Sequence, residues 1–121
     1  MHPSLPPGPS PARGEVWDAD LGIPTGHEQG GPRPCLVVSD DTYNQGPADL
    51  VIVVPLTSNQ RPIPVHVPVA PPEGGLTRPS KILCDQIRCI ARARLRQRRG
   101  MVSPVTLQDV EDRLRALLRL P

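Results

Sequence analysis

The sequence predicts a mainly β domain, built as a small barrel and followed by one amphipathic helix. Short runs of β-branched or alternating residues, each of strand length, succeed one another between residues 14 and 92. Eighteen prolines spread over 121 residues disfavour long helices through most of the chain. Helical spacing of apolar residues begins only at residue 106, so helices do not alternate with the strands as they would in a doubly wound sheet.

Five or six strands are expected, and the clearest segments are residues 14 to 21, 35 to 39, 50 to 57, 65 to 69 and 80 to 92. The second and third are continuous β-branched runs typical of buried strands. Prolines in and before the fourth mark it as an edge strand. In the fifth, side chains alternate between two faces, so Asp85 and Gln86 are expected to point in different directions.

The segments between and after the strands have their own signals. One helical turn, capped by Ser39 or Asp40, is expected after the second strand. Residues 22 to 32 contain four Gly and two Pro and predict an exposed loop. In the terminal helix, over residues 106 to 120, Thr106 begins a sequence that resembles a capping box. The expected apolar face of this helix consists of Leu107, Val110, Leu114, Leu117 and Leu118.

Composition limits the domain organisation and the location. Residues 1 to 12 carry five prolines and little to bury, which predicts a disordered tail ahead of a domain at 13 to 121. Three cysteines without a CxxC pair suit neither a disulfide framework nor a zinc site, so a reducing cytoplasm is the expected compartment. Apolar runs long enough for a membrane span or a secretory signal are absent from the sequence.

Composition and missing motifs also exclude several function classes. Phe is absent, and one Trp and one Tyr cannot build a platform of stacked aromatic rings for nucleic acid. The net charge is only +2, with thirteen Arg and a single Lys. The sequence contains no P-loop, GxSxG, HExxH or GxGxxG motif, so nucleotide, serine-hydrolase and zinc-protease chemistry lose support.

Polar side chains gather in the glycine-rich and proline-rich segment from residue 26 to 34; they are His27, Glu28, Gln29 and Arg33. Exposed loops often carry functional groups, although an ordinary solvated loop has the same composition. Thr57 and Ser58 end the most apolar strand, where hydroxyls either act on a ligand or complete a turn. His66, in the predicted edge strand, is expected to face solvent or pair across strands. The three cysteines, beside aliphatic neighbours, are expected in the core.

Charged residues in and after the fifth strand have two interpretations. Asp85 and Arg88 either form an internal ion pair or serve catalysis, because an unpaired buried charge costs several kcal/mol. An arginine recurs at every second position after them, at Arg92, Arg94, Arg96 and Arg98. On one face of an extended segment these guanidinium groups can hold the phosphates of a single strand. They can equally be a solvated edge that blocks strand pairing.

The order of these motifs resembles one protein family. RGEVWDADLG is followed by GHEQGGPRPCLVVS, VVPLTS, PSKILCDQIRCIARARL, GMVSP and a terminal helix. Over residues 13 to 120 this order is similar to the MazF/PemK toxins of type II toxin–antitoxin systems. The resemblance implies an SH3-like (CcdB/PemK-type) barrel and a homodimer. It implies a metal-independent, sequence-specific endoribonuclease that cuts single-stranded mRNA, and a cognate antitoxin that lays an acidic, largely disordered segment over the RNA groove.

The resemblance also implies roles for single residues. The arginine of the GxRP motif falls on Arg33 and is expected to stabilise charge, and the strand-end threonine falls on Thr57. Glu28 or His27 is expected as the general base, with Asp85 in reserve; the arginine that one branch has two residues before this aspartate is a leucine here. RNA contacts are expected from Gln29, Ser58, Gln86, Arg88, Arg92, Arg94 and Arg96.

An alternative is a non-enzymatic toxin of the same barrel fold that binds DNA gyrase. Such toxins act through a terminal Trp-Gly-Ile, whereas the present sequence ends Leu-Arg-Leu-Pro. A family member that binds RNA without cutting it is a third option, against which Glu28, Arg33 and Thr57 count. The nuclease is therefore the favoured hypothesis.

Overall fold

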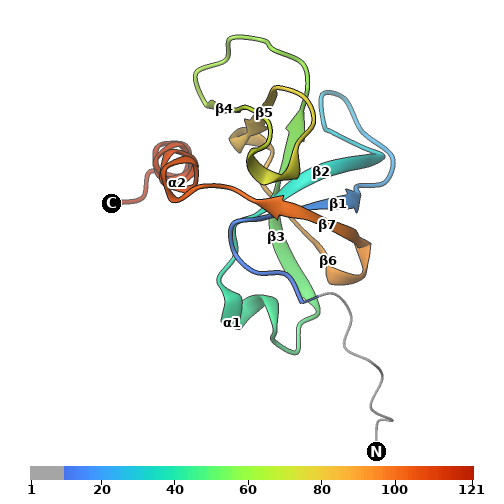
Figure 1. Ribbon diagram of the computed structural model, residues 1–121. Helices are drawn as coiled ribbons and strands as arrows, with labels where there is room; N and C mark the ends of the chain where they lie inside the picture. Colours follow the sequence, from blue (N-terminus) through green and yellow to red (C-terminus); the bar gives the residue numbers. More distant parts are fainter. Residues whose placement is uncertain (1–9) are drawn as a thin grey trace, which may run out of the picture.

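The computed structural model describes residues 10 to 121, in which one antiparallel sheet curls beside a long helix (Figure 1). The strands are β1 (Glu15–Asp20), β2 (Pro32–Val37), β3 (Leu50–Thr57), β4 (His66–Val69), β5 (Ser80–Leu83), β6 (Arg88–Ala91) and β7 (Leu95–Met101). The helices are α1 (Asp41–Asn44) and α2 (Pro104–Leu118), and the 3-10 turns are η1 (Glu73–Gly75), η2 (Cys84–Gln86) and η3 (Arg92–Arg94).

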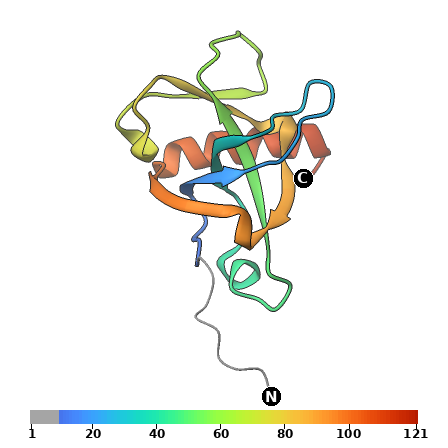
Figure 2. The same ribbon diagram turned by 90° about the vertical axis from the view of Figure 1, so that its right-hand side faces the viewer.

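The sheet has the strand order β4-β5-β3-β2-β1-β7, and β6 also pairs with β3. Along one edge of β3, residues 50 to 53 pair with β6 and residues 56 and 57 pair with β5. The sheet does not close, so the predicted barrel is approximate, while the mainly β class with a terminal helix is confirmed. In Figures 1 and 2, the loops β1–β2 and β3–β4 both project from the end opposite α1.

β3 is buried on both faces, as its continuous β-branched sequence predicts. Val54 and Leu56 belong to the larger apolar cluster, which α2 joins through Val110. Val51 and Val53 alternate with them and belong to a second cluster on the other face of the strand. β3 is therefore held on both faces, and this fixes the position of its polar end.

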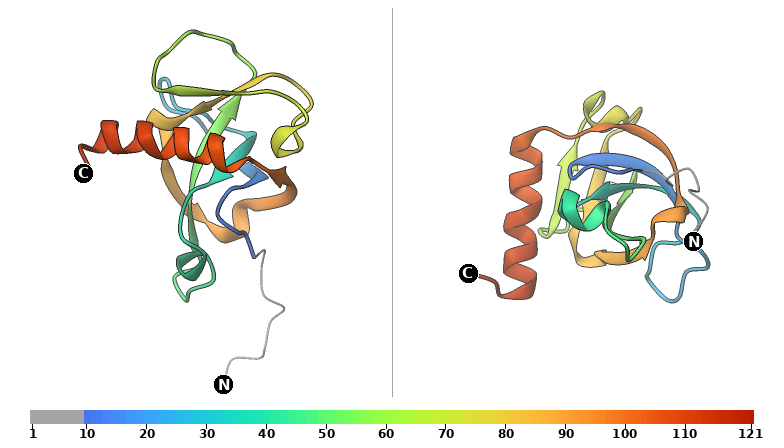
Figure 3. Two further views of the ribbon diagram at one scale, coloured as in Figure 1. Left: turned by 60° about the vertical axis from the view of Figure 1, so that its left-hand side comes forward. Right: turned by 90° about the horizontal axis from the view of Figure 1, so that it is seen from below.

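α2 lies along one side of the sheet (Figure 3), and two predicted details are wrong. The N-cap is Ser103, whose hydroxyl accepts the Thr106 amide at 3.2 Å. Pro104 then occupies the first turn, where its missing N–H is tolerated. On the predicted apolar face, the first three residues contact the core. Leu117 and Leu118 are exposed, because the sheet does not extend beneath the last turn.

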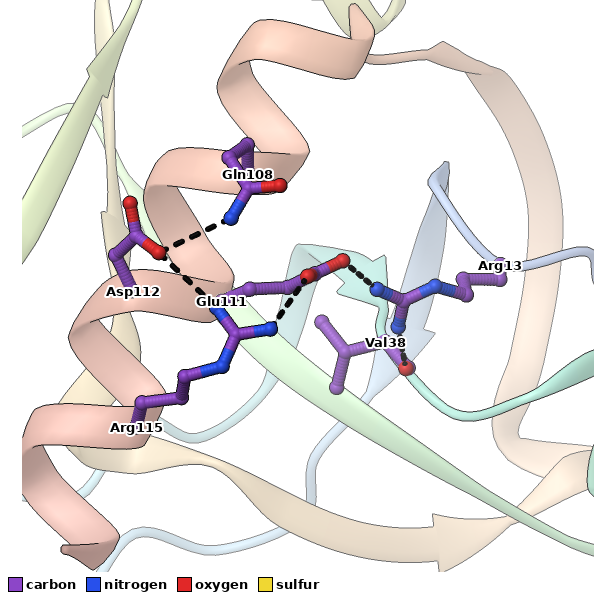
Figure 4. Close-up of polar contacts among 6 residues, drawn as sticks. All are labelled: Arg13, Val38, Gln108, Glu111, Asp112 and Arg115. Atoms are coloured by element: carbon purple, nitrogen blue, oxygen red, sulfur yellow. Dashed lines mark hydrogen bonds and ion pairs between the residues drawn. The ribbon is translucent and has the colours of Figure 1, made fainter. Parts of the chain in front are cut away.

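A polar clamp joins α2 to the start of the domain (Figure 4). The Arg13 guanidinium donates to the Glu111 carboxylate and to the Val38 carbonyl. Arg115 also reaches Glu111, at 3.4 Å, and pairs with Asp112 at 3.0 Å. The clamp fixes the helix at its middle turns and supplements the apolar contacts there.

The predicted tail of residues 1 to 12 lies outside the described residues up to position 9. Pro11 is buried and the Ala12 amide donates to Glu15 Oε1 at 2.6 Å, so the chain is in contact with the domain from there. The predicted turn after the second strand is confirmed as α1, with Asp40 as its N-cap.

The predicted fifth strand, over residues 80 to 92, is wrong as one element. The structure interrupts it with η2, so β5 and β6 pair with separate parts of β3. The interruption carries Asp85 to the surface, where the alternation of one strand does not apply.

The arginines after β6 do not form the predicted extended face. Arg92 and Arg94 lie in η3, a 3-10 turn. Carboxylates occupy most of the ladder: Arg92 pairs with Asp49, Arg96 with Asp20 at 3.8 Å, Arg98 with Glu15 and Arg99 with Asp18. Their contacts with RNA stay predictions, and their first role in this fold is to neutralise the acidic residues of neighbouring segments.

Glu15 provides a testable link between pH and stability. Burial raises the pKa of this carboxyl, but hydrogen bonds from the Ala12 amide, Arg98 and Trp17 outweigh burial and hold it below the usual 4.5. A lowered pKa stabilises the fold above the usual value, and this contribution is lost as the pH falls through the folded value. We expect Glu15→Gln to lower the free energy of unfolding at pH 7 by about 1 to 3 kcal/mol.

Thermal unfolding between pH 7 and pH 3 checks this expectation. The variant is expected to lose less stability in acid than the parent, because the lowered carboxyl pKa is gone. Asp109→Asn is the matched control, since Asp109 has no ion pair within residues 10 to 121. If Glu15→Gln loses as much thermal stability in acid as the parent does, this role of Glu15 is contradicted.

Candidate functional site

The site forms where β2 and β3 separate. The two strands pair at three positions, of which the last is Cys35 opposite Pro55. Beyond it, the first half of β2 stays with β1, and the end of β3 turns to β5. Pro34 has no N–H to donate toward β3, so the ladder can end here without leaving that donor unpaired.

Arg33 and Thr57 face each other across this opening. Each lies two residues beyond the last β2–β3 pair, on the same side of its strand as that pair. Both are half-buried. Arg33 Nε donates to the Gly30 carbonyl at a long 3.4 Å, and within residues 10 to 121 the terminal guanidinium nitrogens have no partner. The Thr57 oxygen accepts the Asn59 amide at 3.2 Å, which leaves its hydroxyl proton free to donate.

The first cleft, called the Arg33 cleft, has a volume of about 300 Å³. Its walls consist of Pro32, Arg33, Pro34, Leu56, Thr57, Ser58, Leu76, Thr77, Arg78, Ser80 and Arg99. Three guanidinium groups and several hydroxyls line it, without a carboxylate. In the described part of the chain, Arg33 and Arg78 form no ion pair. Such a cleft suits a phosphate group, which guanidinium binds through two donors.

A second cleft, called the His66 cleft, adjoins the first and has a volume of about 570 Å³. It is lined by Gly26, His27, Glu28, Gln29, Thr57, Asn59, Arg61, Ile63, His66, Leu83, Asp85 and Gln86. Two imidazoles and two carboxylates, which are side chains of the kinds that transfer protons in catalysis, lie in this lining. Thr57 lines both clefts, so it marks the boundary between the cationic half and the proton-transfer half of the site.

The structure distributes the predicted site residues among different spaces. Thr57 and Ser58 accompany Arg33 in the first cleft, and the residues of the loop and of η2 gather in the second. Arg88 lines a third hollow, of about 370 Å³, together with Asp85 and four further residues. Arg92, Arg94 and Arg96 line none of these three spaces.

Gln86 fixes the loop that carries His27 and Glu28. Its Oε1 accepts the Gln29 amide at 2.8 Å, and its Nε2 donates to the His27 carbonyl at 3.0 Å. Glu28 is held within the loop, because its Oε1 accepts the Thr25 amide at 3.2 Å. The Gln86 carboxamide was expected to contact RNA, but here both of its ends serve the loop backbone.

We expect Gln86→Leu to impair activity through the loop. Both bonds from η2 to the loop would be lost, so His27 and Glu28 would no longer be held in place. A reduction in the rate of about tenfold is expected, in line with the sensitivity of rates to small misplacements. Gln86→Glu keeps the acceptor for the Gln29 amide but loses the donor to the His27 carbonyl, so its loss should be intermediate. Equal rates in all three proteins would contradict this role.

Asp85 and His66 decide two predictions that had alternatives. His66 is buried, which excludes the solvent-facing alternative, and it lies opposite Leu83 of β5, as the cross-strand alternative expected. Its Nε2 lies 2.9 Å from Asp85 Oδ1. The alternative of an ion pair between Asp85 and Arg88 is wrong, because Asp85 turns toward β4 and pairs with the imidazole. η2 explains the position of Asp85, since it moves Asp85 out of the strand that was expected to contain it.

Two arginines of the clefts escaped the sequence analysis. Arg78 lines the Arg33 cleft and Arg61 lines the His66 cleft. A shared signal could have found them, because each precedes a proline, as Arg33 does. A residue before proline is confined to extended backbone, which holds its position in an otherwise irregular segment.

The cysteines lie apart from this chemistry. Burial raises the pKa of Cys35 to about 12 and the pKa of Cys84 to about 11, so neither thiol ionises at neutral pH. Their predicted place in the core is confirmed. Cys89 was expected there too, but it is exposed, with its sulfur 4.0 Å from the Tyr43 hydroxyl.

Residues 10 to 121 contain no group of three or more His, Cys, Asp and Glu side chains that could hold a metal ion. Helices long and apolar enough to cross a membrane were also not found in that part of the chain.

Comparison with known proteins identifies the family. A family model described as the PemK-like, MazF-like toxin of type II toxin–antitoxin systems matches residues 12 to 118. The chain belongs to this toxin family. The resemblance noted from the motif order is therefore confirmed, and the Arg33 and His66 clefts lie on a MazF-like toxin.

Solved structures of MazF toxins have the same fold. MazF from Deinococcus radiodurans is 30% identical, covers 91% of this chain and 97% of its own, and superposes with a TM-score of 0.80. The MazF of a MazE–MazF complex from the same organism is 31% identical, with coverages of 93% and 98% and a TM-score of 0.75. An endoribonuclease in complex with its cognate antitoxin, from a mycobacterial species, is 28% identical, with coverages of 93% and 96% and a TM-score of 0.74.

Proposed function

We propose that this MazF-like toxin is a metal-independent endoribonuclease that cuts single-stranded mRNA at specific sequences and thereby inhibits translation. The observation that carries the proposal is the position of Thr57 between an arginine-lined cleft and a cleft with proton-transfer groups. A phosphodiester bound at Thr57 would have guanidinium groups on one side and carboxylates and imidazoles on the other. The mycobacterial endoribonuclease of the same fold supports this assignment.

Cleavage would use the RNA's own 2′-hydroxyl as the nucleophile. The 2′-oxygen bonds to phosphorus and gives its proton to one of three groups, the His27 imidazole or the carboxylates of Glu28 and Asp85. The bond between phosphorus and the 5′-oxygen then breaks, and the 5′-oxygen takes up a proton from the group that accepted the first one or from water. The products are a 2′,3′-cyclic phosphate and a 5′-hydroxyl end, and DNA is not a substrate because it lacks the 2′-hydroxyl.

Arg33 and Thr57 would stabilise the charge that develops on phosphorus. Arg33 remains cationic at all physiological pH values, so it acts as an electrostatic partner and not as a base. The free hydroxyl proton of Thr57 can be donated to a non-bridging oxygen. Arg78 and Ser58 would hold the neighbouring phosphate groups in the same cleft.

The experiment is incubation of the purified protein with a long RNA in EDTA, followed by mapping of the ends. Cleavage at a few defined sequences is expected, with the products given above. A matched oligonucleotide with a 2′-deoxyribose at the cleavage position should bind and stay intact. Uncut RNA, equal cleavage of the deoxy substrate, or inhibition of DNA gyrase supercoiling without RNA cleavage would overturn the proposal.

The proposal includes a cognate antitoxin and a homodimer. MazF-like neighbours are complexed with antitoxins, and the Arg33 cleft offers cationic groups to the acidic segment expected of an antitoxin. A competition experiment tests the antitoxin's binding site. An antitoxin segment that binds on the Arg33 cleft should displace RNA and stop cleavage at the same concentration. Sedimentation of the free protein tests the dimer.

A further inference from the structure

The contact between His66 and Asp85 in the His66 cleft has no part in the cleavage steps proposed above. His66 begins β4, where it pairs in register with Leu83 of β5. Its side chain is only 8% exposed, whereas the Asp85 side chain is 44% exposed. The imidazole is thus fixed in the wall of the cleft, and the carboxylate projects from that wall into it.

The contact with His66 fixes the orientation of the Asp85 carboxylate. Oδ1 takes the Nε2 bond at 2.9 Å, and within residues 10 to 121 Oδ2 has no hydrogen-bond partner. A carboxylate can rotate about its last torsion when nothing holds it. The single bond to a buried ring removes that freedom, so one oxygen is fixed on the wall and the other is presented to the cleft.

Neighbouring contacts show why η2 alone does not hold this geometry. The turn has three residues and no side-chain cap, so its own backbone constrains Asp85 weakly. The adjacent Gln86 anchors the turn to the loop, which leaves His66 as the contact between the turn's carboxylate and the sheet.

We infer that His66 is a positioning residue, which holds the Asp85 carboxylate toward the RNA at the Thr57 boundary. This inference rests on the proposed nuclease function. It assigns to Asp85 the contact with the reacting ribose, and to His66 an effect that passes only through Asp85. A purely structural histidine would instead stabilise β4 without any link to turnover.

The expected effects separate these roles. His66→Ala should lower kcat by about ten- to hundredfold and leave KM within about threefold, because the oxygen is misplaced while the RNA contacts remain. His66→Gln offers an N–H at the position of Nε2 and should recover most of the lost kcat. In an Asp85→Ala background, His66→Ala should add less than about a twofold change, since the group it positions is absent.

The test is single-turnover and steady-state cleavage of one oligonucleotide by the parent, the three single variants and the double variant, with thermal unfolding recorded for each. Val67→Ala is the matched control, because Val67 is the next residue of β4 and its side chain packs in the core on the other face. It should lower thermal stability and keep the parent kcat at a temperature well below unfolding. RNA affinity is measured with the 2′-deoxy oligonucleotide.

Three outcomes would overturn the inference while the nuclease assignment stands. They are an unchanged kcat in His66→Ala, a loss that Gln does not restore, and independent losses from His66→Ala and Asp85→Ala. If the parent protein does not cut RNA at all, the proposed function fails first. The positioning role then fails with it.

Discussion

Replacing Arg33 by alanine is expected to lower the rate of RNA cleavage by about a hundredfold or more. Its guanidinium lies in a cleft with two further arginines and no carboxylate, so its charge is available to a bound phosphate. The loss should appear in kcat, because the charge on the non-bridging oxygens increases only as the 2′-oxygen attacks. Single-turnover kinetics on one mapped site measures this step directly.

Two comparisons make the Arg33 result specific. Arg33→Lys keeps the charge but offers a compact ammonium in place of a planar fork, so recovery should be partial. Arg119→Ala removes the same charge from the end of α2, outside the three spaces described, and should leave the rate unchanged. A rate for Arg33→Ala within threefold of the parent would remove Arg33 from the catalytic assignment.

The second large effect is expected at Thr57. Thr57→Val has nearly the same shape but no hydroxyl, so it should lose the hydrogen bond to a non-bridging oxygen and about a hundredfold in rate. Thr57→Ser restores the hydroxyl and should recover activity to within about tenfold, the remainder being due to the freer rotamer of serine.

Thermal unfolding accompanies the Thr57 series, because the Asn59 amide loses its acceptor in Thr57→Val. Thr42→Val, at an exposed position of α1, controls for the general effect of the exchange. If Arg33 and Thr57 stabilise the same phosphoryl group, the double variant should lose less than the product of the two single losses. Full independence of the two losses would argue for separate sites.

Much of the fold could be predicted from local sequence patterns. The buried run of β3 and the β-branched end of β2 were predictable, because two apolar faces leave little choice of structure. Arg33, which stands between two prolines, and Thr57, a hydroxyl at the end of an apolar strand, could also be singled out. Their position in one cleft depends on the register of β2 against β3, which is a long-range pairing that no local pattern contains.

The missed features have a common physical cause. The strand from residue 80 to 92 has an alternating pattern throughout, and the break at η2 arises because two strands share one edge of β3. That break excludes the expected ion pair between Asp85 and Arg88, and Asp85 contacts His66 instead. The single extended face of arginines was wrong for a similar reason, because its carboxylate partners, Glu15, Asp18, Asp20 and Asp49, are distant in the sequence.

The absence of an amide donor where β2 and β3 separate affects how a ligand binds. A gap maintained by a missing amide donor is pre-formed, so occupying it requires no strand to be peeled away. Association is then limited by encounter and not by a slow opening step. Substituting alanine for Pro34 would return a donor to the edge of β2, so that the two strands pair further and the entrance to the cleft narrows.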